Sequence, residues 1–169
     1  MVNLSRYVGE TIVLNQPSLR KRNYELVIND EMIATLVFPK LLSNRALAEI
    51  SDHRFEFKQP NIWKGEYGIY KAGYQMPFAN YVPNFWKTKG TIELPKGIRL
   101  NCKSGKFRKP FEIYSSRGEL LVIFENNFSL RGRTLVTIQK NFEQLDKHPW
   151  ILLLGCYITL LYRRARAAH

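Results

Sequence analysis

The sequence is poor in the side chains on which most catalytic and metal sites depend. Its 169 residues include two cysteines and three histidines. Cys102 and Cys156 stand 54 positions apart, which fits neither a zinc-ligand spacing nor a redox pair. His53, His148 and His169 stand in no recognisable catalytic motif, and a Gly-x-Ser-x-Gly nucleophile elbow is absent. We therefore expect a protein that is not an enzyme and that binds no metal or cofactor.

Acidic residues are also scarce relative to basic ones. The chain has 26 Lys and Arg against 14 Asp and Glu, a net charge of +12. The excess is concentrated in residues 86–169, which hold 16 basic and 6 acidic side chains. Its densest part, from Lys87 to Lys109, supplies the candidate ligand-binding residues Lys87, Lys89, Arg99, Lys103, Lys106, Arg108 and Lys109. Such an excess attracts nucleic acid, anionic lipid or another phosphate-bearing partner, although it is also typical of a solvated surface.

Long apolar runs are rare as well. Residues 1–6 contain no apolar stretch of the kind found in secretory signals, so we expect a cytoplasmic protein, either free or peripheral to the membrane. The exception is Trp150–Tyr162, which is apolar on every side and is followed by arginines. Pro149 suits the first position of a helix, and the basic residues suit its C-terminal end. The pattern predicts a helix over about 147–166.

A helix that is apolar all round must be buried by protein or by lipid. Trp150–Tyr162 has 13 residues, which span roughly 20 Å at about 1.5 Å per residue. The hydrocarbon core of a bilayer is about 30 Å thick. The length therefore favours a helix in the protein core, with a tail-anchored membrane protein as the structural alternative.

Upstream of this helix, apolar and polar residues alternate with a period of two between closely spaced turn residues, as in antiparallel barrels and sandwiches. The predicted strands cover residues 10–14, 24–28, 32–38, 46–51, 54–59, 66–71, 76–82, 90–94, 98–103, 110–115, 119–125 and 134–139. Closure removes exposed edges, and a closed barrel of this size leaves a lumen that its own side chains cannot fill. We predict an all-β fold with one C-terminal helix: a single domain, 1–169, in which about twelve antiparallel strands (about 10–140) form a closed barrel around the buried hydrophobic helix.

In this architecture, residues 10–166 resemble the tubby C-terminal domain, whose fold is shared in outline by phospholipid scramblases and LURP-one-related proteins. The helix Trp150–Tyr162 carries most of the resemblance, which also extends to uncharacterised bacterial proteins with a similar C-terminal helix. The resemblance implies a barrel of about twelve strands around a hydrophobic C-terminal helix. Tubby domains bind phosphoinositides through basic side chains, but no motif transfers those residues to particular positions here. The Pro-rich arm, Asp-rich calcium loop and cysteine cluster of scramblases are not visible in the sequence, which argues against lipid scrambling.

Aromatic residues lie close to the basic ones in the sequence. Trp63, Phe85, Trp86 and Phe107 have lysines or arginines as near neighbours. This mixture is typical of a nucleic-acid stacking surface and of a site that contacts lipid headgroups, and it also occurs where rings belong to the core or cap the end of a barrel and the lysines cover them. Our leading hypothesis is a binding module for an anionic ligand such as a lipid headgroup, at the membrane surface. A nucleic-acid-binding protein that uses the Lys87–Lys109 region is the alternative, and the oligomeric state stays open.

Overall fold

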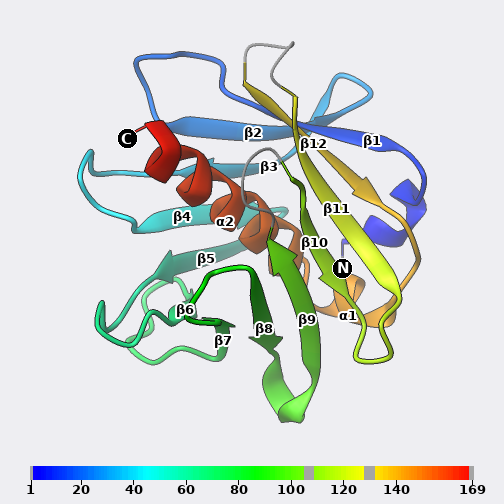
Figure 1. The fold of residues 1–169 in the computed structure, drawn as a ribbon. Helices are drawn as coiled ribbons and strands as arrows, with labels where there is room; N and C mark the ends of the chain where they lie inside the picture. The colour runs from blue at the N-terminus through cyan, green and yellow to red at the C-terminus, as the bar shows by residue number, and fades with distance from the viewer. Residues whose placement is uncertain (1, 105–108, 128–131, 168–169) are drawn as a thin grey trace.

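The computed structural model describes residues 2–104, 109–127 and 132–167. Within them the chain forms twelve strands that close into one barrel (Figure 1). The strands are β1 Thr11–Asn15, β2 Asn23–Ile28, β3 Glu31–Val37, β4 Ala46–Ile50, β5 His53–Lys58, β6 Tyr67–Lys71, β7 Ala79–Pro83, β8 Lys89–Glu93, β9 Arg99–Ser104, β10 Phe111–Tyr114, β11 Leu120–Asn127 and β12 Arg133–Ile138. Two α-helices follow, α1 Glu143–Lys147 and α2 Trp150–Ala167, and short 3-10 helices occupy Leu4–Tyr7 and Pro95–Gly97.

The strands follow one another around the barrel in chain order. Each is antiparallel to its neighbours, and β1 closes the ring by pairing with β12, with Thr11 opposite Thr137. The predicted closed barrel of about twelve strands is thereby confirmed. The largest difference in strand bounds is at β7, which was expected to begin at residue 76 and begins at Ala79, because Met76 and Pro77 belong to the β6–β7 connection.

Side chains alternate between the lumen and the outside, as the period of two predicts. On β9, Leu100 and Cys102 are buried, while Arg99, Asn101 and Lys103 between and beside them are exposed. The basic residues of this strand therefore belong to the outer surface of the barrel.

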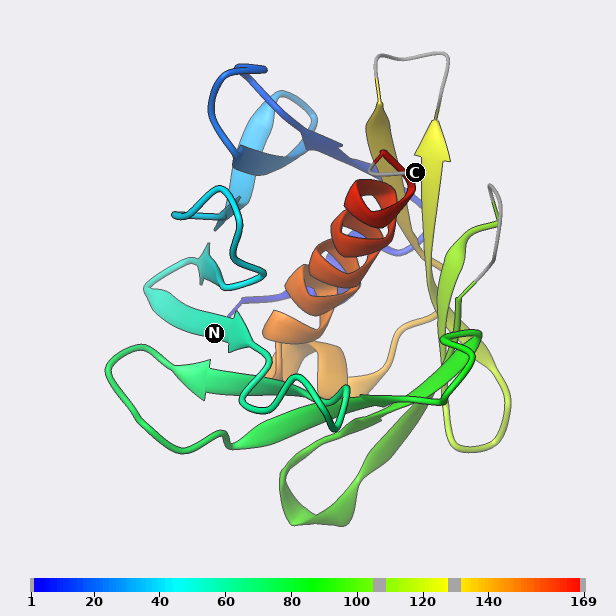
Figure 2. The same cartoon turned by 60° about the vertical axis from the view of Figure 1, so that its left-hand side comes forward.

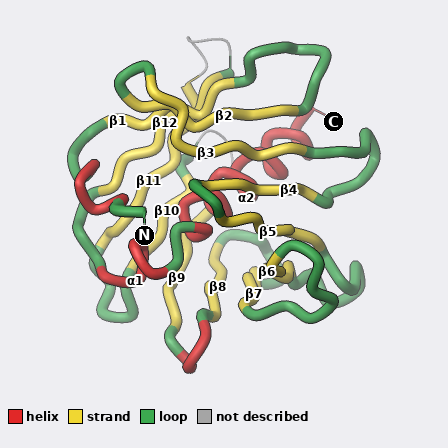
Figure 3. The backbone as a smooth tube through the Cα atoms, turned by 180° about the vertical axis from the view of Figure 1, so that it is seen from behind, coloured by secondary structure: helices red, strands yellow, loops and turns green. Residues whose placement is uncertain are grey.

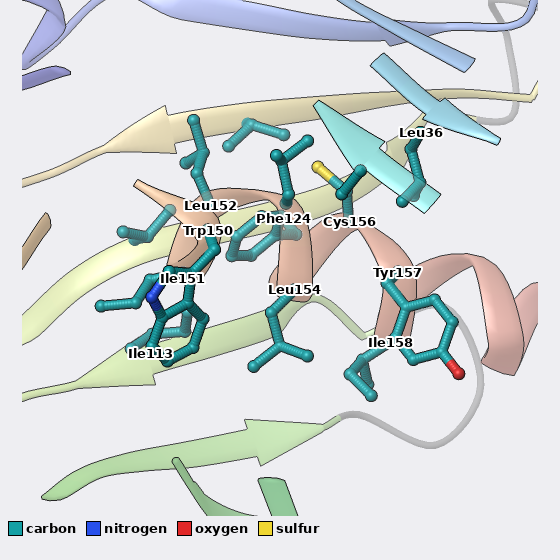
Figure 4. Packing of buried hydrophobic residues seen from close by; sticks show 14 of the residues in the cluster. Leu36, Ile113, Phe124, Trp150, Ile151, Leu152, Leu154, Cys156, Tyr157 and Ile158 are labelled. Atoms are coloured by element: carbon teal, nitrogen blue, oxygen red, sulfur yellow. The ribbon is translucent and has the colours of Figure 1, made fainter. Parts of the chain in front are cut away.

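Helix α2 runs inside the ring of strands (Figure 2). Every residue from Trp150 to Leu161 is buried, and the helix contacts β3, β4 and β5 on one side and β10 and β11 on another. Figure 4 shows side chains of the strands, among them Leu36 and Phe124, against the helix. In the described part of the chain, no helix combines the length and the apolarity needed to cross a membrane.

The start of α2 differs from the expectation. Helix α1 ends at Lys147, and α2 begins at Trp150 rather than at Pro149. The residue before a proline is disfavoured in helical conformation, and His148 accordingly has φ −130° and ψ 69°. Asp146, at the end of α1, accepts hydrogen bonds from the Ser5 backbone N–H (3.0 Å) and hydroxyl, which ties the N-terminal segment to the helices.

The two ends of the barrel are different. Because all neighbouring strands are antiparallel, alternate connections share an end. The exit end, where α2 leaves the barrel, carries the loops β1–β2, β3–β4, β5–β6 and β7–β8, at residues 16–22, 38–45, 59–66 and 84–88. The opposite entry end carries the N-terminal segment, α1 and the turns β2–β3, β4–β5, β6–β7, β8–β9 and β10–β11. Figure 3 shows the first three of these loops on the side of the C-terminus, with the N-terminus and α1 on the other side.

Candidate anion-binding surface

Two of the predicted basic residues, Lys89 and Lys103, become direct partners across the β8–β9 pair. Both side chains are exposed on the outside of the barrel. Cβ atoms of directly opposite residues lie about 4.5–5.5 Å apart, and like charges in that position destabilise a sheet. Among the described residues, the ion pairs include neither lysine. The register therefore brings two positive charges together at this point, with Glu112 of β10 opposite Lys103 on its other side.

A shallow groove of about 490 Å³ lies beside these lysines on the outer face of β7–β10. Besides Lys89 and Lys103, its polar lining consists of Asn84, Thr91, Asn101 and Tyr114. The Lys103 ammonium lies 4.7 Å from the centre of the Tyr114 ring. The Tyr114 hydroxyl donates a 2.7 Å hydrogen bond to Glu112, which stands opposite Lys103 on β10. The Tyr114 hydroxyl is therefore already engaged as a donor, and the lysine ammonium groups, the Thr91 hydroxyl and the amides of Asn84 and Asn101 are the groove donors suited to binding oxyanions.

Of the other predicted basic residues, two lie toward the same end of the barrel wall as Lys89 and Lys103. Lys87, in the β7–β8 loop, accepts a hydrogen bond on its carbonyl from the Ser104 hydroxyl, and Lys109 is exposed just before β10. Both lie toward the exit end, as do Lys89 and Lys103. Arg99 does not join them: it begins β9, about 13 Å from Lys103 at about 3.3 Å per residue, opposite Glu93. Lys106 and Arg108 lie outside the described residues.

The exit end contains a second concentration of positive charge that sequence reasoning missed. Its four loops, as defined above, carry seven Lys or Arg and a single carboxylate, Glu66. The segments of the entry end, residues 2–10, 29–30, 51–52, 72–78, 94–98, 115–119 and 139–149, carry five basic and six acidic side chains. The barrel is therefore polarised along its axis, with its positive end where α2 emerges.

The same four loops expose large apolar side chains. Seven of them are 67–96% exposed: Leu19, Leu41, Leu42, Ile62, Trp63, Phe85 and Trp86. The exposed positions of Trp63, Phe85 and Trp86 rule out the interpretation that these rings belong to the core, while Phe107 lies outside the described residues. The grouping of these loops could have been predicted from the order of the strands, because every second turn of an up-and-down barrel lies at the same end.

Arginines of α2 anchor the exit end to the barrel wall. Arg163 donates hydrogen bonds to the Asn126 side chain (2.6 Å) and to the Thr134 hydroxyl (2.5 Å). Arg164 lies 4.9 Å from the centre of the Phe38 ring and donates to the carbonyl of Leu41 (3.2 Å). Burial, with a smaller contribution from Arg22, lowers the pKa of Arg164. The contacts of Arg164 tie the β3–β4 loop to α2.

Neither cysteine has the exposed thiol of lowered pKa that is typical of reactive cysteines. Cys102 and Cys156 are buried, and burial raises the pKa of both thiols. Burial also lowers the pKa of His148. Across residues 2–104, 109–127 and 132–167, no group of three or more His, Cys, Asp and Glu side chains could hold a metal ion.

Comparison with known proteins supports the fold. No family model matches the sequence, and no curated protein matches it. The structure is similar to an X-ray structure of a protein from Arabidopsis thaliana, with a TM-score of 0.58 and 10% sequence identity over 89% of this chain and 93% of that chain. The resemblance to tubby-like domains stays a prediction. The likeness to the plant protein shows that this chain shares its overall fold.

Proposed function

We propose that this protein is a non-enzymatic binding module for an anionic ligand, and that the ligand is a lipid headgroup at a membrane surface. The observation that carries the proposal is the pairing of Lys89 with Lys103 beside the groove on β7–β10. A pair of like charges weakens the sheet. An anion that bridges the two ammonium groups would offset this repulsion and would also reach the hydroxyl and amide groups of the groove.

The surroundings of the pair support an anionic partner. Lys87 and Lys109 lie toward the same end of this wall, and the nearby loops are predominantly basic. A lysine or arginine near an anionic membrane contributes about 1 kcal/mol of binding free energy. Loss of both groove lysines should therefore weaken binding by about 2 kcal/mol, or roughly 30-fold.

The test is co-sedimentation with vesicles of phosphatidylcholine alone and of phosphatidylcholine mixed with phosphatidylserine. We expect the protein to bind the mixed vesicles, and the variant K89E/K103E to bind at least roughly 30-fold more weakly. The matched control is K140E/K147E, which makes the same change of charge at the entry end, where the side chains of Lys140 and Lys147 are both 53% exposed. It should retain most of the binding.

Two results would overturn the proposal. If the unmodified protein binds neither vesicle, it is not a lipid-headgroup module. If both double variants lose binding equally, net charge rather than the groove is responsible. A single-stranded oligonucleotide added to the same assay tests the alternative, because a nucleic-acid-binding protein would bind it tightly at low salt and release it steeply as salt rises.

A further inference from the structure

The apolar residues of the exit end sit on ordered turns. Asn61 accepts a hydrogen bond from the Trp63 backbone N–H on its side chain (2.9 Å) and from the Lys64 N–H on its carbonyl (3.2 Å). In the β7–β8 loop, Asn84 accepts hydrogen bonds from the backbone N–H groups of Thr88 (2.9 Å) and Lys87 (3.0 Å). The turns therefore present Trp63 and the Phe85–Trp86 pair outward as built features of the fold.

The β3–β4 loop is tied to a neighbouring loop and to α2. The backbone carbonyl of Leu41 accepts hydrogen bonds from Arg22 of the β1–β2 loop and from Arg164 of α2, so two guanidinium groups lie next to this loop. In each of the four loops, a lysine or arginine also directly neighbours an exposed apolar residue in the sequence. Proteins that contact the membrane–water interface commonly place arginine and lysine beside tryptophan and leucine.

The arrangement fits a bilayer better than a protein surface. The apolar residues come in ones and twos on four separate loops, with Lys or Arg in every loop. A protein partner would need a matching pocket for each tip, whereas lipid headgroups move aside for each tip independently. A single carboxylate among seven cations complements an anionic surface.

We propose that the exit end of the barrel docks end-on against an anionic lipid bilayer, with the apolar tips of its loops inserted below the headgroups and the surrounding lysines and arginines at headgroup level. The inference rests on the proposed function and adds the orientation and the mode of attachment. The axis of α2 then points toward the membrane, while the entry end, with its balanced charge, faces away from it.

The three tryptophans allow a direct test. Trp63 and Trp86 are at the exit end, while Trp150 is 1% exposed in the core. In the variant W86F, vesicles containing phosphatidylserine should shift Trp63 emission to shorter wavelength, and lipids brominated on their acyl chains should quench it. In W63F/W86F, only Trp150 remains, and neither change should occur.

Matched substitutions test whether the tips contribute to binding. L42S/W63S removes two exposed apolar side chains from the exit end, and we expect at least ten-fold weaker binding to the mixed vesicles. Y74S/M76S is the control, because Tyr74 and Met76 are 68% and 78% exposed on the β6–β7 connection at the opposite end. That variant should bind like the unmodified protein.

The outcomes separate this inference from the proposed function. If the unmodified protein binds anionic vesicles but Trp63 is not quenched and L42S/W63S binds equally well, end-on docking is wrong and the groove proposal stands. If L42S/W63S loses affinity for a single-stranded oligonucleotide but not for vesicles, the tips are a base-stacking surface and the inference is overturned. If the unmodified protein binds no vesicle, the proposed function itself fails.

Discussion

Gly155, in the middle of α2, offers the sharpest test of the filled barrel. A Cβ atom added there would lie 2.0 Å from Cζ of Phe124 on β11 and 2.4–2.5 Å from the two Cε atoms of that ring. Non-bonded carbons normally approach to about 3.5–4.0 Å. The ring is fully buried and packs 5.7 Å from the ring of Phe111, between centroids, so it has little room to move. The substitution G155A must therefore displace the helix or the strand.

Helix propensity and overpacking have opposite effects on the free energy of unfolding of G155A. Alanine is favoured over glycine in a helix by about 1 kcal/mol. Overpacking of a core costs about 1–3 kcal/mol and occasionally more, and an overlap of this size belongs at or above the upper part of that range. We expect G155A to lower the free energy of unfolding by about 2 kcal/mol, which corresponds to a decrease in Tm of about 4–8 °C in a chain of this length.

Urea and thermal denaturation followed by circular dichroism would measure the change, and a second substitution identifies its cause. F124L removes the end of the ring and has a cost of its own, since it leaves a cavity. If the clash with Phe124 is responsible, G155A/F124L should be less destabilised than the sum of the single variants by about 1 kcal/mol or more. A G155A protein more stable than the original, as expected for a helix without close neighbours, would refute the packing of α2 against β11.

Two further predictions concern ionisable groups. Hydrogen bonds from Arg45, and secondarily from Lys58, lower the pKa of Glu56 below its ordinary value of 4.5. The ionised carboxylate therefore stabilises the fold above that pH and ceases to do so as the pH falls through the lowered pKa. E56Q should have a lower Tm than the original at neutral pH, and the difference should vanish in acid; a difference independent of pH would contradict this. The buried thiols of Cys102 and Cys156 should resist alkylation by iodoacetamide in the native protein and react after unfolding, so rapid native labelling of Cys156 would mean that α2 is not enclosed.

Features that depend on the local sequence were predictable. The alternation on β9 follows from the order of Arg99, Leu100, Asn101, Cys102 and Lys103 alone, and the apolar surface of α2 follows from its composition. Helix α1 was not predicted, because five residues with one buried side chain, Leu145, leave too short a periodicity to recognise.

The candidate site was predictable only in part. The abundance of lysine in residues 87–109 is visible in the sequence, but the pairing of Lys89 with Lys103 depends on the register of β8 and β9. The 3-10 turn Pro95–Gly97 sets that register, with Lys96 at a positive φ of 64°. Register decides which side chains meet, since a shift by one residue moves every side chain of a strand to the opposite face.

The sequence by itself determined the strand periodicity, the all-apolar helix and the excess of positive charge, because each is a property of residues close together in the chain. Only the tertiary structure decided which charges and apolar residues meet. The polarised exit end exists because β1 pairs with β12 across 120 or more residues, which closes the barrel and places loops as distant as 16–22 and 84–88 at the same end. Such pairing depends on contacts between distant strands, so no single stretch of the sequence contains it.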